Sequence, residues 1–178
     1  SSQMSNMSYS PYGVMKRVGE LHTTALKGLI VKFWNVYGIE KDMEKAHVIT
    51  DFIRRGFEEG EFEMLTDGTE QRQFLYAEDC CEALETVMDC YSDFKPEDPL
   101  HITSFNATSI NDIASIIQGQ FNLIDRFDVK IKPGLAKDSV QMDKRNEADT
   151  YITGWWTPKT GIDQGITKVF QEMKKNYD

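Results

Sequence analysis

The sequence predicts an α/β fold, and three observations support this prediction. Segments with helical patterning alternate with short strand-like runs along most of the 178 residues. The run GLIVKFWNVYG at 28–38 is rich in apolar, β-branched and aromatic residues, which is typical of a buried strand in a parallel sheet. The first predicted element is a helix without a strand before it, although parallel strands are joined through βαβ units. We therefore expect the later part of a larger α/β domain.

Each element has its own local signal. Ser10 can cap a helix and Pro11 suits the first helical position, so we expect a helix from there to Gly28, followed by a strand. Turn residues and changes in periodicity mark the later elements. In order, these are a helix closed by Gly60, a strand in 61–68, a strand and helix in 72–91, a strand in 100–106, a helix capped by Thr108 or Ser109, a strand in 126–134 and a closing helix in 161–175.

Composition excludes several classes of partner. The net charge is −9 and the pI is about 4.9, which argues against nonspecific binding to nucleic acid or to anionic membranes. The three cysteines, Cys80, Cys81 and Cys90, match neither a disulfide framework nor a zinc site, so we expect no metal and a reducing compartment. No apolar run is long enough to span a bilayer. These features predict a soluble, cytoplasmic protein.

The first predicted helix carries residues suited to acid/base chemistry. Tyr12 and Lys16 stand four positions apart, so both side chains leave the same helix face. A nearby ammonium favours the phenolate form of a tyrosine, and the start of a helix adds positive potential. A hydroxyl such as that of Ser2 could complete a proton relay to a substrate. The alternative is a surface tyrosine that packs on a lysine stem, since this spacing also arises by chance.

Five motifs together resemble one family. They are SPYGVMKRVGE, VKFWNVYG, HVITDFI, TDGTEQRQFLYAEDCCEAL and GWWTPKTGIDQGI, and they span nearly the whole chain. In this order they resemble the extended short-chain dehydrogenase/reductase family, the NAD-dependent sugar-nucleotide epimerases and dehydratases. The resemblance implies the C-terminal part of a Rossmann-like parallel sheet plus a smaller α/β substrate-binding domain. Residues 1–60 would be the last part of the Rossmann-like domain, to which the chain returns around 72–105, and 61–178 would be mostly substrate-binding domain.

The dinucleotide-binding half of such an enzyme is not recognisable in this sequence. Family members begin with a glycine-rich fingerprint, and neither G-x-G-x-x-G nor G-x-x-G-x-x-G occurs here. We therefore expect the N-terminal half to be absent and these 178 residues alone to be inactive.

The resemblance also implies catalytic roles. Tyr12 matches the family's acid/base, and Lys16 matches the lysine that binds the nicotinamide ribose and activates the tyrosine. Ser2 is the closest match to the catalytic hydroxyl, although it stands only ten positions before Tyr12. Gln3 and Met4 replace the Asp-Glu pair that 4,6-dehydratases carry after this hydroxyl, which lowers the expectation of a dehydratase.

Five further residues match the family's substrate-binding positions. By resemblance they would hold the nucleotide sugar, and Asn35 would also lie at the cofactor; the set is Asn35, His47, Val48, Arg72 and Arg145. A backbone amide at a helix start suits an anion, and a guanidinium fits phosphate oxygens. Each residue also has an ordinary alternative role, as a turn-forming asparagine, a surface histidine or a strand-edge arginine. We expect Asn35 and Arg72 to share one cleft that faces the Tyr12 hydroxyl.

Other residues are expected to be structural. Asp79 is interpreted as a helix cap and structural anchor rather than a ligand. Trp155 and Trp156 are expected to pack against other side chains rather than to stack on a base, and Phe33 and Trp34 are expected to lie in the core.

The complete enzyme is therefore predicted to bind NAD or NADP and a nucleoside-diphosphate sugar. It would oxidise a sugar hydroxyl transiently and return the hydride as an epimerase. The alternatives are a nucleotide-sugar ketoreductase or dehydratase of the same family, or a non-catalytic fragment that binds sugar nucleotides. The resemblance also implies a homodimer in which two copies meet through the helix that carries Tyr12 and Lys16.

Overall fold

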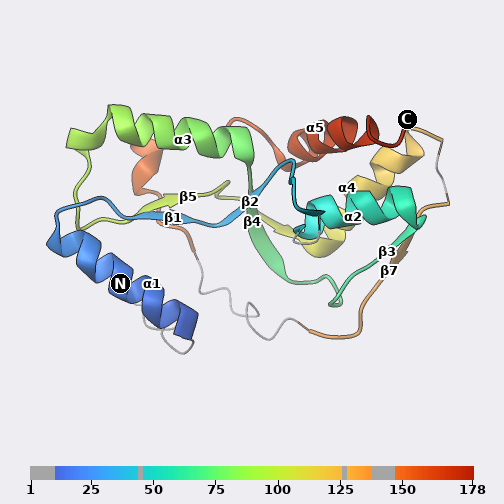
Figure 1. Cartoon of the computed structure of the whole chain (residues 1–178), viewed down its shortest axis with the longest axis horizontal. Coiled ribbons are helices and arrows are strands. Elements are labelled where there is room, and N and C mark those ends of the chain that lie inside the picture. Colours follow the sequence, from blue (N-terminus) through green and yellow to red (C-terminus); the bar gives the residue numbers. More distant parts are fainter. Residues whose placement is uncertain (1–10, 44–45, 126–127, 138–146) are drawn as a thin grey trace.

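The structure is a computed structural model that describes residues 11–43, 46–125, 128–137 and 147–178. Within these ranges lie five α-helices and seven short strands (Figure 1). The helices are α1 (Pro11–Ala25), α2 (Val48–Glu58), α3 (Ala77–Asp89), α4 (Ile110–Asn122) and α5 (Ile162–Lys174). The strands are β1 (Val31–Phe33), β2 (Asn35–Tyr37), β3 (Glu61–Glu63), β4 (Gln71–Tyr76), β5 (Leu100–Ile102), β6 (Ala107–Ser109) and β7 (Lys130–Lys132). None of the described helices has the length and apolar character to cross a membrane.

The strands form three small sheets in which most neighbours are parallel. β1 pairs with β5, β2 pairs with β4, and β3 pairs with β7, all in parallel. The alternation of helices with parallel strands confirms the predicted α/β class. The single strand expected at 28–38 is instead divided at Trp34 into β1 and β2. Trp34 still donates its backbone N–H to Ile102 at 3.4 Å, and Val36 N then bonds back to the Trp34 carbonyl at 3.2 Å, so the chain turns from one sheet into the next.

The short strand β6 was not expected, and it prepares the start of α4. It runs antiparallel to β4, with Arg72 opposite Thr108 and Gln71 opposite Ser109. The Ser109 hydroxyl accepts from the Asp112 backbone N–H at 3.0 Å, and the Asp112 carboxylate accepts from the Ser109 N–H at 3.3 Å. This capping box identifies Ser109 as the cap of α4 and leaves Thr108 in the strand.

One end of the molecule is built on the pair β1 and β5. Figure 1 shows α3 on one face of this pair and α1 on the other. The core here lies mainly between the strands, α3 and the 3₁₀ turn Tyr151–Gly154. Its buried residues are Leu75, Cys80, Ala83, Val87, Phe94, Leu100, Ile102, Ile152 and Trp156.

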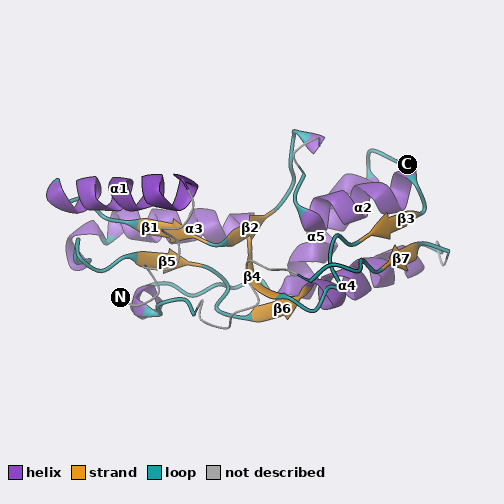
Figure 2. Cartoon of the chain, turned by 90° about the horizontal axis from the view of Figure 1, so that it is seen from below, coloured by secondary structure: helices purple, strands orange, loops and turns teal. Residues whose placement is uncertain are grey.

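The other end is built on α2, α4 and α5, which pack together beside β3 and β7 (Figure 2). Helix α2 buries Ile49, Phe52, Ile53 and Phe57 on one face, the spacing of an amphipathic helix. Gly56 completes this face, because a Cβ there would lie 2.3 Å from the ring of Phe121 in α4. A larger residue at 56 would therefore separate α2 from α4.

No single boundary in the sequence separates the residues of one core from those of the other. α2 lies in the core with α4 and α5, whereas α3, which comes later, lies in the core with β1 and β5. The division into a Rossmann-like part at 1–60 and a substrate-binding part at 61–178 stays a prediction.

Asp79 connects the two ends of the molecule. Its carboxylate is buried and accepts hydrogen bonds from the backbone N–H groups of Lys159 at 3.0 Å and Thr160 at 2.7 Å. The Thr160 hydroxyl donates to the other oxygen at 3.0 Å. The expected anchor role is thus confirmed. The expected cap role is wrong, because Tyr76 is the N-cap of α3 and Asp79 lies in the first turn.

The roles expected of the aromatic residues are confirmed only in part. Trp156 is buried, and the Trp155 ring packs 4.7 Å from that of Phe94 between centroids. Phe33 was expected in the interior, but its side chain is 53% exposed because β1 ends at the rim of a cavity.

Candidate functional site

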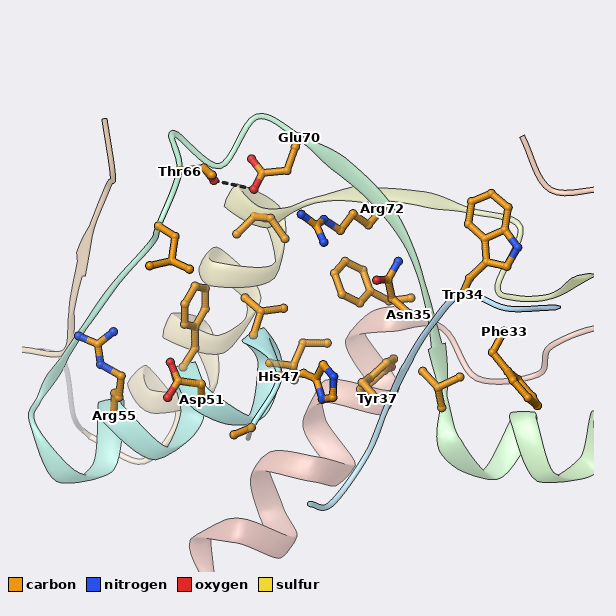
Figure 3. Close-up of a pocket in the computed structure, with 18 of the residues that line it drawn as sticks. Phe33, Trp34, Asn35, Tyr37, His47, Asp51, Arg55, Thr66, Glu70 and Arg72 are labelled. Carbon is orange, nitrogen blue, oxygen red and sulfur yellow. Dashed lines mark hydrogen bonds between the residues drawn. The ribbon is translucent and has the colours of Figure 1, made fainter. Parts of the chain in front are cut away.

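A cavity of about 730 Å³ lies between the strands β2 and β4 and the helix α2. We call it the main cavity. Four of the predicted substrate-binding residues line it: Asn35, His47, Val48 and Arg72. Figure 3 shows Asn35 and Arg72 at one wall and His47 at another. The predicted set is therefore brought together at one place, while its binding role stays a prediction.

The strand wall of the main cavity follows from register and alternation. Asn35 opens β2 opposite Phe74 of β4, and its side-chain amide donates to the Gln73 carbonyl at 3.3 Å. Arg72 and Phe74 stand two apart in β4, so both side chains face the cavity, and both line it. The β4 strand thus presents a cation beside an aromatic ring.

The helix wall is the first turn of α2. His47 is the N-cap, with φ −80° and ψ 167°, but no side chain caps the helix. The N–H groups of the first turn are left without an intrahelical partner, and they lie at the end of the helix that carries positive potential. Such a turn beside a guanidinium is suited to a phosphate group.

Glu40 holds His47 at the rim of the main cavity. One carboxylate oxygen accepts the His47 backbone N–H at 2.8 Å, and the other makes a short contact with His47 Nδ1. Partial burial raises the pKa of the Glu40 carboxyl, but the hydrogen bonds from His47 outweigh this, so the net pKa is lowered. The carboxylate therefore stays ionised and fixes the orientation of the imidazole ring.

The end of the main cavity away from Asn35 carries residues that the sequence analysis did not identify. Asp51 and Arg55 leave α2 one turn apart and both line the cavity, and Figure 3 shows them beyond His47. Thr66 and Glu70 lie across from them, joined by a hydrogen bond of 2.5 Å from the threonine hydroxyl to the carboxylate. The spacing of 51 and 55 was the available signal, because it places both on one face of α2.

Tyr12 and Lys16 lie elsewhere, beside a second, shallow hollow. The Lys16 ammonium is 5.5 Å from the centre of the Tyr12 ring, which agrees with their shared helix face. This Tyr12 hollow is lined by α1 and by residues 29–31, and neither Tyr12 nor Lys16 lines the main cavity. The expected single cleft is thus divided in two, because α1 covers β1 and the main cavity begins beyond it.

The two hollows border the same short segment of chain. Val31 lines the Tyr12 hollow and Phe33 lines the main cavity. They stand two apart in β1, so they leave the same face of the strand about 7 Å from each other. The two hollows thus border neighbouring residues of β1.

Two predicted site residues lie outside the described residues, namely Ser2 and Arg145. In the part of the chain that the structure describes, no group of three or more His, Cys, Asp or Glu residues could hold a metal ion.

Comparison with known proteins decides the family. Residues 3–102 match the family described as NAD dependent epimerase/dehydratase. The chain belongs to this family. The family resemblance inferred from the five motifs is therefore confirmed.

The individual proteins that this chain resembles share little sequence identity with it. The GDP-L-fucose synthase of Sinorhizobium fredii is 27% identical over 153 residues, which cover 80% of this chain and 45% of the synthase. Among solved structures, the UDP-glucose 4-epimerase of Thermotoga maritima, determined with UDP-glucose, has a TM-score of 0.74 at 20% identity over 95% of this chain and 55% of its own. The UDP-glucuronic acid 4-epimerase of Bacillus cereus, in complex with UDP-glucuronic acid and NAD, has a TM-score of 0.73 at 22% identity, over 94% of this chain and 54% of its own.

These similarities establish the Rossmann-like fold for the described region. The chain spans about half the length of the relatives that it matches.

Proposed function

We propose that the whole protein is an NAD(P)-dependent epimerase of nucleoside-diphosphate sugars. One observation carries the proposal: the Arg72 side chain and the uncapped first turn of α2 line the same cavity. Each is suited to phosphate oxygens, and together they could hold both phosphates of a nucleoside diphosphate. Asn35 adds a side-chain amide at the same wall.

The sugar would extend past Phe33 toward the Tyr12 hollow. There the Tyr12 hydroxyl would take and return the proton of a sugar hydroxyl, and the Lys16 ammonium would favour the phenolate. The Tyr12 phenol and the Lys16 ammonium are also groups that fit the nicotinamide and ribose end of a dinucleotide. NAD or NADP would supply hydride transfer when bound, and residues outside this chain would hold its pyrophosphate.

Arg72 provides the test of the phosphate site. In the whole protein, Arg72→Ala should weaken binding of a nucleoside diphosphate about ten- to a hundredfold, because a charged hydrogen bond is lost. Lys132→Ala is the control, since it removes one positive charge from β7, outside the lining of the main cavity. Calorimetric titration measures both, and an unchanged dissociation constant in Arg72→Ala would contradict the assignment.

A nucleotide-sugar ketoreductase is the second candidate, because the similar GDP-L-fucose synthase is named as a synthase rather than an epimerase. Both reactions would use Tyr12 and Lys16. Incubation of the whole protein with cofactor and nucleoside-diphosphate sugars separates the two reactions, because only an epimerase forms product without net consumption of NADH or NADPH.

We also propose that the protein is cytoplasmic and that the 178 residues alone do not turn over substrate.

A second copy of the protein is the proposed partner of α1. Val14, Val18 and Leu21 form an apolar stripe at i, i+4 and i+7, and their side chains are 44%, 40% and 56% exposed. We expect Val18→Glu to convert a dimer of the whole protein to a monomer in analytical ultracentrifugation. Met88→Glu, on the exposed face of α3, should leave the dimer intact. A monomeric wild-type protein would contradict this proposal.

A further inference from the structure

We propose that the main cavity selects guanosine diphosphate sugars, with the guanine base held by Asp51 and Arg55 of α2. The inference rests on the proposed function, since it assumes a nucleoside diphosphate in this cavity, and it adds the identity of the base. It is carried by two charged side chains that the phosphate site does not use.

The position of the two residues fits the nucleoside end of such a ligand. If the phosphates lie at the first turn of α2, the nucleoside must extend along the cavity, and Figure 3 shows Asp51 and then Arg55 beyond His47. Arg55 stands seven residues after Val48, about 10 Å along the helix axis. A ribose fills much of that span, which places a base edge beside these side chains.

The Asp51 carboxylate is prepared to accept hydrogen bonds. Its side chain is 30% exposed, and its Oδ1 accepts from Arg54 Nη2 at 2.7 Å. Arg54 also binds Glu58 at 2.7 Å, so the guanidinium holds the carboxylate in place from outside the cavity. Among the described residues, no hydrogen bond uses Asp51 Oδ2. An ionised carboxylate accepts only, and its two oxygens match the adjacent N1–H and 2-amino donors of guanine.

Arg55 supplies the complementary donors. Its Nη1 donates to the Glu63 carbonyl at 3.3 Å and its Nε contacts Glu59 at 3.4 Å, which leaves Nη2 without a partner among the described residues. The side chain is 22% exposed at the cavity wall. A guanidinium pairs with the O6 and N7 acceptors of guanine, and O6 lies next to the N1–H donor on the ring.

An apolar side chain of the same cavity offers a surface for the base plane. Leu65 lines the main cavity and is 92% exposed. A purine laid against it would remove this apolar area from water. The larger purine also covers more of the side chain than a pyrimidine does.

The other common bases fit this pair less well. Uracil presents one N–H between two carbonyl oxygens, so a carboxylate that accepts the N–H also faces an acceptor. Adenine offers a single amino donor on its pairing edge, with an acceptor beside it. Hypoxanthine keeps the O6, N7 and N1–H of guanine and lacks only the 2-amino group, so inosine diphosphate isolates the contact with Asp51.

The experiment is calorimetric titration of the whole protein with GDP, IDP, ADP and UDP. We expect GDP to bind most tightly, about fivefold or more above IDP. In Asp51→Asn, the GDP affinity should fall about ten- to a hundredfold and the preference over IDP should disappear. Glu58→Gln is the matched control, because it removes the other carboxylate partner of Arg54 but lies outside the cavity lining. That variant should keep the wild-type ratio of GDP to IDP affinity.

Three results would overturn the inference. UDP or ADP binding to the wild-type protein as tightly as GDP overturns it and leaves the proposed function standing. An equal loss of GDP and IDP affinity in Asp51→Asn also overturns it, because a merely structural role predicts that loss. Failure of every nucleoside diphosphate to bind overturns the proposed function together with the inference. The wild-type comparison needs no variant, so it decides even if Asp51→Asn does not fold.

Discussion

Helices α1 and α2 both carry predicted site residues, yet the protein holds them in opposite ways. Helix α1 has 15 residues and buries only Gly13. Helix α2 has 11 residues and buries six of them. One half of the predicted site is therefore built on a packed core, whereas the other half lies on a surface helix.

The packed half owes its geometry to aromatic side chains that pack in the core behind α2. Phe52 of α2 stacks on Phe62 of β3 at 4.7 Å, and Phe57 meets Phe121 of α4 at 4.9 Å between ring centroids. Each buried aromatic or aliphatic side chain contributes about 1.5–3 kcal/mol by leaving water. Because this burial fixes α2, it also fixes the amide groups at its first turn.

The surface half depends on a few polar contacts. Glu20 of α1 forms ion pairs with Lys32 of β1 at 3.0 Å and with Arg17 at 2.8 Å. The pKa of Glu20 is lowered overall, since these two cations outweigh the opposing effect of partial burial. Partly exposed ion pairs of this kind contribute little to stability. Substitutions on α1 should therefore affect function more than folding, and those behind α2 should do the reverse.

The largest expected effect lies on α1 and concerns turnover. In the whole protein, Tyr12→Phe should lower kcat by about 10²–10⁴-fold, the usual contribution of a positioned acid/base group. The melting temperature should stay unchanged, because the ring is 68% exposed and the substitution keeps it. Tyr91→Phe, at another exposed tyrosine outside both hollows, is the control. Wild-type turnover in Tyr12→Phe would remove Tyr12 from the mechanism.

A large effect on folding is expected behind α2. Phe121 is fully buried in contact with Phe57 and Phe170, so Phe121→Ala should lower the free energy of unfolding by about 3–5 kcal/mol. Leu123→Ala, two residues later and 78% exposed, should change it by less than about 0.5 kcal/mol. Chemical denaturation measures both. Equal effects would mean that this core does not hold the helices.

The smallest effect is a pH dependence confined to the α1 side. Burial lowers the pKa of His101 in β5, and the charge of Lys32 adds to this, while Asp149 and Glu20 oppose it. His101 Nδ1 also accepts the Asp149 backbone N–H at 3.1 Å, which requires an unprotonated nitrogen. The unfolded chain therefore takes up this proton at a higher pH than the folded chain, so stability falls as the pH drops below about 6.5.

Hydrogen exchange can locate this pH effect. Between pH 7.5 and 5.5, amide protection corrected for intrinsic rates should decrease more in β5 than in α4. In His101→Gln, the difference between the two elements should shrink. A uniform decrease across both cores would show that His101 is not the group responsible.

The sequence predicts best where local and tertiary preferences agree. The apolar face of α2 can be identified from spacing, and the cap of α4 can be narrowed to Thr108 or Ser109, of which the structure has Ser109. The gathering of Asn35, His47 and Arg72 was expected only by resemblance, because each stands on a different element.

The sequence predicts less well where a distant pairing overrides a local pattern. Trp34 sits within a run that looks like one strand, and only the different partners of β1 and β2 reveal the break. The strand β6 has little strand-forming composition and exists because β4 pairs with it. The roles proposed for Asp51 and Arg55 could not be predicted from the sequence, because the cavity that both residues line is closed by side chains from other elements, such as Thr66 and Glu70.

The buried carboxylate of Asp79 has a consequence for how the molecule comes apart. Asp79 belongs to α3, whose apolar face lies in the core with β1 and β5. Its carboxylate accepts hydrogen bonds from Lys159 and Thr160, which stand just before α5, and α5 lies in the other core. Asp79 thus links the two halves together with β4, whose Phe74 lies in one core and Leu75 in the other. Melting of either half would remove these supports from the other, so the two halves are expected to unfold as one unit.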